Sequence, residues 1–419
     1  MLFVIIAGGY LGFQTGWVGY SVSSGYFPYG INGVLAGSAT VFFAYIGFDS
    51  VASTAEEVKN PQRDLPWGIG LALSTCCFLY MMVSVVIVGL VPYFAMDPDT
   101  PISTAFSRNG MQWAMYIVTT GAVLALCSTL MGSILPQPRI LMAMSRDGLL
   151  PPFFSEINSH SQVPVKSTVL TGIGAAILAF FMDVSELAGM VSVGTLLAFT
   201  MVAISILILR YVPPSEVPLP SSFHESIISV SSRYSAQEID VEIKEDSKQV
   251  LDMEPSAVCP LIGKEVVQDK ANEQERRKKA SWSIVFVCIG VLILTSSASA
   301  SFLPSPVQYV ACSVGGLLLL SGLFVLSCTD QDDARHSFGH AGGFICPFVP
   351  FLPVCCILIN SYLLINLGAS TWMRVSIWLV IGVLVYIFYG RTHSSLTDAI
   401  YVPSAHVDEI CRTASRSTV

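Results

Sequence analysis

The stretch GVLAGSATVFFAYIGFDSVASTAEEVKNPQRDLP, residues 33–66, decides the class of fold. It begins as an apolar segment of membrane length, but Gly47 interrupts the helical pattern and Asp49 places a carboxylate inside the apolar run. An acidic side chain within a span costs about 2.5–3.5 kcal/mol on insertion scales, so such residues face a cavity, a partner or a substrate path. A glycine beside it lets the backbone open, which is tolerated at membrane depth where the chain lines a cavity. The stretch therefore predicts a broken transmembrane helix.

The composition of the whole chain places it in a membrane. Its 419 residues are 53% hydrophobic and only 12% charged, with a mean hydropathy of +0.65. A soluble domain carries about 25% charged residues. The net charge of −8 argues against nucleic acid as a partner. The eleven cysteines lie mostly in apolar runs without metal-ligand spacing, so we interpret them as packing or lipid-facing residues.

Ten apolar segments follow one another along the chain, and nine are long enough to span, since a span needs about 20 residues. These nine cover residues 32–55, 68–92, 112–140, 167–183, 187–210, 282–303, 307–328, 343–366 and 371–390. The tenth, residues 1–13, is too short, and it lacks the basic start and the cleavage site of a signal peptide. We expect it to be the second half of a helix whose first half is missing.

Basic residues predict which side of the membrane each loop faces. Nine lie in loops on one side, against Arg108 and Arg374 on the other. The nine are Lys59, Arg63, Arg146, Lys166, Arg210, Arg335, Arg391, Arg412 and Arg416. We therefore expect the side with the nine basic residues to be cytosolic.

A polar break divides the predicted spans into two groups. Residues 211–281 are rich in Ser, Glu, Asp and Lys and poor in aromatic residues, which predicts a disordered cytosolic loop. Residues 32–210 before it hold five spans, residues 282–390 after it hold four, and residues 391–419 form a polar cytosolic tail that we expect to be mobile.

The predicted break carries aromatic residues on both sides. Residues 42–49 read Phe42, Phe43, Ala44, Tyr45, Ile46, Gly47, Phe48 and Asp49. One interpretation is an unwound segment whose carbonyl groups accept hydrogen bonds from a substrate ammonium, with the aromatic rings as a gate and a cation–π surface. The alternative is an ordinary aromatic-rich helix with Asp49 near its cytosolic end.

Small residues mark a second candidate position in the span at 112–140. Gly132 and Ser133 leave room beside a substrate, or they let two helices approach closely. Pro136 and Pro138 follow at once and predict a bend. The sequence shows no nucleophile–base pair, phosphate loop or metal cluster, so we expect neither an enzyme nor a cofactor or metal.

Long motifs in the chain resemble the cationic amino acid transporters of the amino acid–polyamine–organocation superfamily, in their plant form. The motifs are FFAYIGFDSVASTAEEVKNPQRDLP (42–66), GSILPQPRILMAMSRDGLLP (132–151), LAGMVSVGTLLAF (187–199) and FYGRTHSSL (388–396). The resemblance implies an all-α multi-pass membrane protein with two inverted five-helix repeats, similar to the bacterial leucine transporter, and four further C-terminal helices. It also implies that the second repeat, helices six to ten, is intact at 32–210.

The resemblance further implies roles for the candidate residues. Segment 32–55 resembles the sixth core helix, with Phe43 as the gating aromatic and Gly47 at the break. Phe42, Tyr45 and Ile46 would line the amino-group side of the pocket, and Ser133 in the eighth helix would help admit long basic side chains. On this resemblance we expect helices one to four and the first half of helix five to be absent and residues 1–13 to be a remnant of helix five.

From these observations we expect alternating-access transport of L-amino acids, favouring Arg and Lys, by a truncated form with impaired transport. The alternatives are a neutral amino acid or polyamine carrier, and a non-transporting regulatory subunit of a full-length homologue. The expected partners are small L-amino acids, the lipid bilayer and a full-length homologue. We expect the vacuolar membrane, with the plasma membrane as the alternative.

Overall fold

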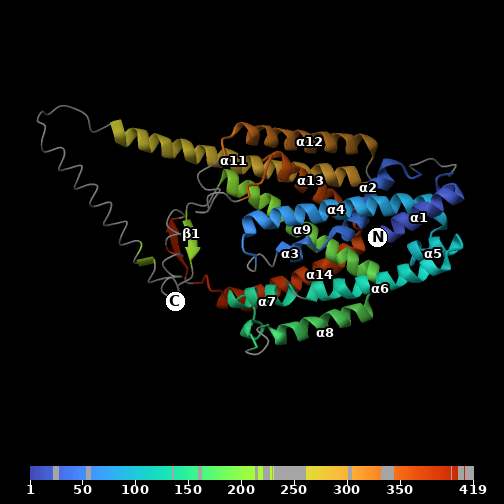
Figure 1. Ribbon diagram of the computed structural model, residues 1–419. Coiled ribbons are helices and arrows are strands. Elements are labelled where there is room, and N and C mark those ends of the chain that lie inside the picture. The colour runs from blue at the N-terminus through green and yellow to red at the C-terminus, as the bar shows by residue number, and fades with distance from the viewer. Residues whose placement is uncertain are drawn as a thin grey trace, which may run out of the picture. The chain divides into compact units, whose positions relative to one another are not determined.

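The computed structural model describes most of the chain and shows a set of helices (Figure 1). It describes residues 1–21, 28–52, 58–134, 136–158, 163–212, 216–219, 227–228, 230, 261–300, 304–331, 344–397, 399–403 and 410. Within these ranges the regular secondary structure is helical apart from one two-stranded antiparallel sheet. The protein is therefore an all-α multi-pass membrane protein, as predicted.

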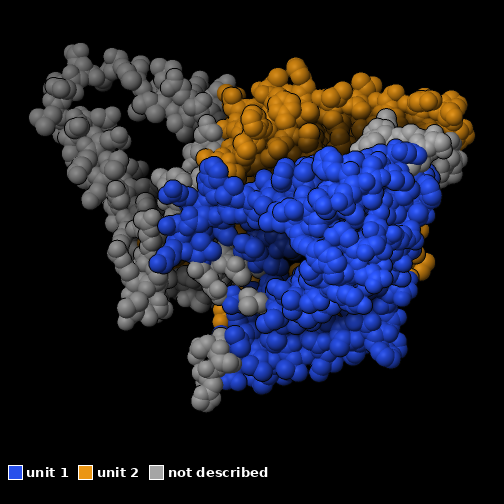
Figure 2. Space-filling view, turned by 45° about the vertical axis from the view of Figure 1, so that its right-hand side comes forward, with its two compact units in different colours: residues 1–145, 152–192 blue, residues 146–151, 193–419 orange. Residues whose placement is uncertain are grey.

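The chain forms two compact units, coloured separately in Figure 2. Unit 1 comprises residues 1–145 and 152–192, and unit 2 comprises residues 146–151 and 193–419. The division falls inside one long helix, between Ser192 and Val193.

Unit 1 holds the N-terminal helices. They are α1 (Leu2–Thr15), η1 (Val18–Tyr20), α2 (Gly30–Val41), η2 (Phe42–Tyr45), α3 (Phe48–Ala52), α4 (Pro61–Leu90), η4 (Tyr93–Ala95), α5 (Pro101–Arg108), α6 (Gln112–Ile134), most of α7 (Pro136–Arg146), η5 (Pro152–Ser155), α8 (Val165–Phe181) and the start of α9 (Val184–Tyr211).

Unit 2 holds the rest of α9 and the C-terminal elements. They are β1 (Glu216–Leu219), α11 (Leu261–Ser299), α12 (Ser305–Cys328), α13 (Phe351–Asn366), α14 (Ala369–Val385), a π-helical turn η8 (Tyr386–Gly390), α15 (Arg391–His393) and β2 (Ile400–Pro403).

Seven helices within the described residues are long and apolar enough to cross a membrane. They run over Gly33–Ala52, Pro61–Leu90, Gln112–Arg146, Val184–Tyr211, Asn272–Ser299, Ser305–Cys328 and Ala369–His393. Two of the nine predicted spans are not among these seven, since α8 has 17 residues and α13 has 16. The length of α8 equals that predicted for 167–183, whereas α13 is shorter than the predicted 343–366. The reason for both short helices lies at their ends: Pro164 precedes α8 and an extended Met182 follows it, and α13 begins only after Pro350. Segment α1 is short, as predicted.

The core of unit 1 lies where α1 packs on α4 and on the α5 region. Phe106 is fully buried there, together with Val4, Leu11, Val86 and Leu90. Between membrane helices such side chains stabilise the contact by van der Waals packing rather than by removal from water.

The core of unit 2 lies along α11 and α12, which run side by side in Figure 1, with α13 against them. Val287, Val291 and Leu326 are fully buried in this core. A β-carbon at Gly315 would lie 2.7 Å from the Leu294 amide nitrogen, so the two backbones approach closely at this glycine. Small residues thus set the spacing of this helix pair.

The predicted disordered loop, residues 211–281, is corrected near both ends, because residues 216–219 form strand β1 and residues 261–281 form the first turns of α11. Ion pairs one helical turn apart stabilise these turns, with Glu273 2.5 Å from Arg277 and Glu275 3.5 Å from Lys279. Residues 231–260 of that predicted loop lie outside the described residues.

The expectation of a mobile tail is corrected at residues 391–403. Strand β2 pairs antiparallel with β1, with Val402 opposite Val217 and Ile400 opposite Leu219. Leu219 and Val402 are both buried, because alternate residues of a strand point to the same face. The tail therefore contributes a strand, while residues 404–409 and 411–419 lie outside the described residues.

Candidate functional site

The helix that begins at α2 is broken within residues 42–47, which confirms the predicted break. The α-helical turns tighten to a 3₁₀ turn over η2, and Ile46 is then extended with φ −68° and ψ 137°. Gly47 has a φ of 134°, a conformation that glycine adopts and other residues rarely do, and α3 begins at Phe48. The alternative of one continuous aromatic-rich helix is therefore wrong.

Backbone hydrogen bonds on either side of the break show where the helical ladder stops. The Ile46 amide donates to the Phe43 carbonyl at 3.2 Å, which closes the 3₁₀ turn. The Ser50 amide donates to the Gly47 carbonyl at 3.2 Å, so the α-helical bond from Ser50 to Ile46 is not made. The carbonyl of Ile46 is thereby released from the helix, as in the discontinuous helices of transport proteins.

Side chains of the broken segment divide between packing and exposure. Tyr45 packs on α4, where its ring meets Tyr80 edge to face at 5.4 Å and the Cys77 side chain lies nearby. The Phe43 side chain is 44% exposed, on the other hand. Tyr45 therefore anchors the break to α4, and Phe43 offers a free ring face.

The remaining residues of the break lie beside these two. Phe42, Ile46 and Phe48 are half-buried, and Gly47 is exposed. Asp49 is exposed in the first turn of α3, where a carboxylate is favoured by the positive end of the helix dipole.

Gly132 and Ser133 lie in the last turn of α6 and are exposed. The Ser133 hydroxyl donates to the Thr129 carbonyl at 2.9 Å, one turn back along the same helix. A β-carbon at Gly132 would meet no other atom within 4 Å among the described residues. Gly132 therefore lies in open space rather than at a close helix contact.

The structure brings residues 42–49 together on one segment, but it does not join Gly132 or Ser133 to them. The main packing partner of α3 is α4, whereas that of α6 is α5. Within the described residues, no hydrogen bond, ion pair or ring contact links either α6 residue to the break.

Comparison with known proteins identifies the family. The Amino acid permease profile matches residues 1–230, and the profile for the C-terminus of these permeases matches residues 344–394. The chain belongs to the amino acid permease family. The first match contains both candidate positions, and the second contains α13 and α14.

The permease is also similar to named transporters. It is 64% identical to Cationic amino acid transporter 3, mitochondrial, and 63% identical to Cationic amino acid transporter 2, vacuolar, both from Arabidopsis thaliana, over 100% and 98% of this chain. It is 32% identical to mouse Cationic amino acid transporter 4 over 100% of this chain. The chain spans 67%, 66% and 66% of the length of these relatives. The resemblance seen in the motifs is confirmed, and the family is one of transporters rather than enzymes.

Sequence reasoning missed the residues of α4 that hold the break in place. Cys77 and Tyr80 lie three positions apart and so share one face of that helix. They sit in a continuous apolar run, which gives no signal that one face contacts Tyr45.

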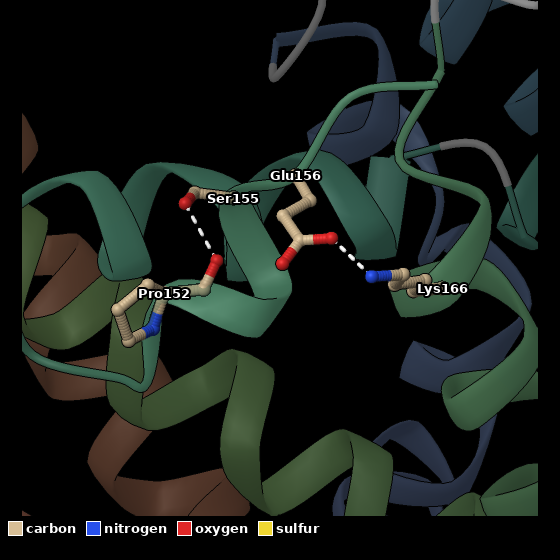
Figure 3. A network of polar contacts seen from close by, with 4 residues as sticks. All are labelled: Pro152, Ser155, Glu156 and Lys166. Atoms are coloured by element: carbon tan, nitrogen blue, oxygen red, sulfur yellow. Dashed lines mark hydrogen bonds and ion pairs between the residues drawn. The ribbon is translucent and has the colours of Figure 1, made fainter.

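A polar contact between α7 and α8 was also missed (Figure 3). The Lys166 ammonium pairs with the Glu156 carboxylate and lies 5.4 Å from the centre of the Phe153 ring, while the Ser155 hydroxyl donates to the Pro152 carbonyl at 2.7 Å. Because both charged side chains are more than half exposed, this pair orders the loop more than it stabilises the fold.

Proposed function

We propose that the permease transports L-amino acids across a membrane by alternating access, and that it favours the cationic amino acids Arg and Lys. The broken helix at residues 42–47 carries this proposal, because it combines a released carbonyl with an exposed aromatic ring. The family match and the names of the relatives support the substrate class.

The carbonyl groups around Ile46 would receive the substrate ammonium. They end the α2–η2 helix, whose C-terminal end carries the negative part of the helix dipole. Carbonyl oxygens accept hydrogen bonds from an ammonium without needing a buried acidic side chain. This arrangement recognises the part that all amino acids share.

The exposed ring of Phe43 would act as the gate beside that group. A cation over an aromatic face gains about 0.5–2 kcal/mol, depending on how dry the contact is. The open space at Gly132 and the small side chain of Ser133 would leave room for a long basic side chain that extends toward α6.

The membrane we propose is the vacuolar one. Two of the Arabidopsis relatives are named as vacuolar and one as mitochondrial. A fluorescent fusion in plant cells that labels the vacuolar membrane supports this location, and one that labels mitochondria or the plasma membrane overturns it.

Radiolabelled arginine uptake in a transport-deficient host tests the proposal. Because the chain spans about two thirds of its relatives, uptake is measured for this chain and for the same chain joined to the part of a plant relative outside the match. We expect saturable arginine uptake by the joined protein. Absence of uptake by both proteins, with both present in the membrane, would overturn the proposal.

A variant of the gate sharpens this test. Phe43→Leu should lower arginine uptake about 10-fold, the size of a lost cation–π contact of roughly 1.4 kcal/mol. Phe180→Leu is the matched control, because Phe180 is an exposed phenylalanine of α8. Equal uptake by the two variants would show that the Phe43 ring does not contact the substrate.

Competition separates the proposed substrate from its alternatives. Excess lysine should abolish labelled arginine uptake, whereas leucine and putrescine should leave most of it. Strong competition by leucine or by putrescine would instead indicate a neutral amino acid or polyamine carrier. Co-purification with a longer homologue whose transport falls on co-expression would indicate the non-transporting subunit.

A further inference from the structure

Helix α11 carries four consecutive basic residues where its apolar part begins. Residues 276–279 read Arg276, Arg277, Lys278 and Lys279, and the segment Asn272–Ser299 is apolar enough to span a membrane. A basic run directly beside a membrane span is the arrangement that attracts acidic lipids.

Among the described residues, carboxylates of the same helix offset part of the positive charge of this run. Glu273 pairs with Arg277 and Glu275 pairs with Lys279 on the same helix. Arg276 donates at 2.9 Å to the backbone carbonyl of Asp330, a partner that does not cancel its charge. Among the described residues, neither of these two ion pairs involves Lys278.

Lys278 is the cation of the run best placed for an outside ligand. It is exposed, and among the described residues it forms no ion pair. Lys279 is 70% exposed and its partner lies 3.5 Å away at the surface, so that pair is weak. Both lysines can therefore reach a phosphate without breaking a strong internal contact.

One turn further into the apolar part lies an exposed aromatic pair. Trp282 is 64% exposed, its ring lies 6.1 Å from that of Phe286, and Phe286 is 42% exposed. Lys278 and Trp282 are four positions apart and so share one side of the helix. Tryptophan is enriched at the level of the lipid headgroups, where its ring contacts the acyl chains.

The opposite face of α11 at these turns packs against other helices. Ala280, Ile284, Val287 and Val291 are buried in the core that α11 forms with α12 and α13. An outward stripe is left, made of Lys278, Trp282 and Phe286, and it has no protein partner within that core. Along the helix this stripe runs from a cation through an indole to an apolar ring, which is the order of charged headgroup and apolar chain in a phospholipid.

We propose that this stripe, with Lys279 beside it, binds the headgroup phosphate of an acidic phospholipid. The two lysines hold the phosphate, and Trp282 and Phe286 contact the upper part of the acyl chains. The apolar half of the stripe distinguishes a lipid from free phosphate, which would use the lysines alone.

Native mass spectrometry of the detergent-solubilised full chain tests the proposal, and its readout requires no transport. The probes are phosphatidylserine, phosphatidylcholine and inorganic phosphate. We expect phosphatidylserine to be retained preferentially, and Lys278→Gln with Lys279→Gln to reduce that retention about 25-fold, since each lysine near a membrane surface contributes about 5-fold. Lys166→Gln is the matched control, an exposed lysine elsewhere on the chain.

Three results would overturn the proposal. One is equal retention of phosphatidylserine and phosphatidylcholine, which would mean that binding does not depend on the net negative charge of the lipid headgroup. Another is an equal loss in the Lys166→Gln control. The third is displacement of the lipid by millimolar inorganic phosphate together with no effect of Trp282→Ala, which would indicate a free-anion site.

Discussion

Around Gly47 the backbone has room, whereas around Gly315 the backbones of two helices touch. A β-carbon at Gly47 would meet no atom within 4 Å among the described residues, but the φ of 134° there is one that other residues rarely adopt. A β-carbon at Gly315 would lie 3.0 Å from the Gly290 carbonyl, in a helix of ordinary conformation. The first glycine is needed for its torsion angle and the second for its size.

The two glycines therefore belong to regions with different roles: the broken segment at residues 42–47 exposes groups for binding, whereas the α11–α12 pair is closely packed. The broken segment is anchored to α4 through Tyr45 and leaves a carbonyl and an aromatic ring available. The α11–α12 pair is continuous and shares a buried core. Substitutions in the two regions should therefore affect different measurements, transport for the first and stability for the second.

The largest effect should come from closing the space between α11 and α12. Gly315→Leu would drive a side chain into the backbone of α11, and overpacking of this kind costs about 3 kcal/mol. We expect the Tm of the detergent-solubilised protein to fall by about 10 °C. Gly316→Leu is the matched control, because that neighbouring glycine has open space around it. Equal Tm values for the two variants would contradict the close packing.

The next effect should appear at the break. Gly47→Ala imposes a strained torsion angle costing about 1–3 kcal/mol. The strain should shift the carbonyl of Ile46, so we expect arginine uptake to fall about 10-fold while the Tm changes by only a few degrees. Gly37→Ala, within α2 and also in open space, should leave uptake unchanged. A large fall in Tm for Gly47→Ala would show that the break supports the fold instead.

A smaller effect is expected where the C-terminal tail meets the loop after α7. Gly148 has a φ of 75°, and a β-carbon there would lie 1.9 Å from the His393 carbonyl oxygen. Gly148→Ala should therefore speed hydrogen exchange at the Ser395 amide about 5-fold, since this amide donates to the Asp147 carbonyl at 2.9 Å. Gly110→Ala, with a φ of 80° and open space, controls for torsional strain alone. Unchanged exchange at Ser395 would contradict this contact.

The smallest effect concerns the loop before α5 and depends on pH. Backbone amides of Thr100 and Asp99 donate to the Asp97 carboxylate at 3.0 and 2.9 Å, and these bonds lower its pKa. Because the folded-state pKa is lowered, the stabilisation is present above the ordinary value of about 3.9 and is lost as pH falls through the folded-state pKa.

Hydrogen exchange at the Thr100 amide, followed as the pH is lowered, measures this effect. Protection beyond the intrinsic pH dependence should weaken only in the acidic range, and Asp97→Asn should abolish that weakening. Asp99→Asn is the control beside it. If the Thr100 amide of Asp97→Asn still lost protection at acidic pH, the loss would have to come from another titrating group.

The sequence predicted the break because its signal is local. Glycine beside aromatic residues in an apolar run is readable from residues 42–49 alone. Most spans were predictable for the same reason, since length and hydropathy suffice. The approach of α11 and α12 at Gly290 and Gly315 was not predicted, because many glycines lie in apolar runs and only the partner backbone decides which of them is crowded.

Features that depend on distant partners could not be predicted from local composition. The first turns of α11 read as a polar linker, and their stability comes from paired charges one turn apart. Strand β2 was predicted to be part of a polar tail, but Val402 is buried in a cluster formed with Leu219 of β1 and with Ile227, Val230 and Ile410. Likewise, nothing in the apolar run of α4 marks Tyr80 as the contact of Tyr45.

Arginine-protected labelling of Ile46→Cys tests the central claim most directly. A membrane-impermeant thiol reagent is applied with and without saturating arginine, and labelling of the parent protein, which has its own cysteines, is subtracted. If the released carbonyl of Ile46 lines the substrate path, arginine should slow labelling at position 46 but not at Ile177→Cys, an exposed position of α8. Labelling of Ile46→Cys at the same rate with and without arginine would contradict the account.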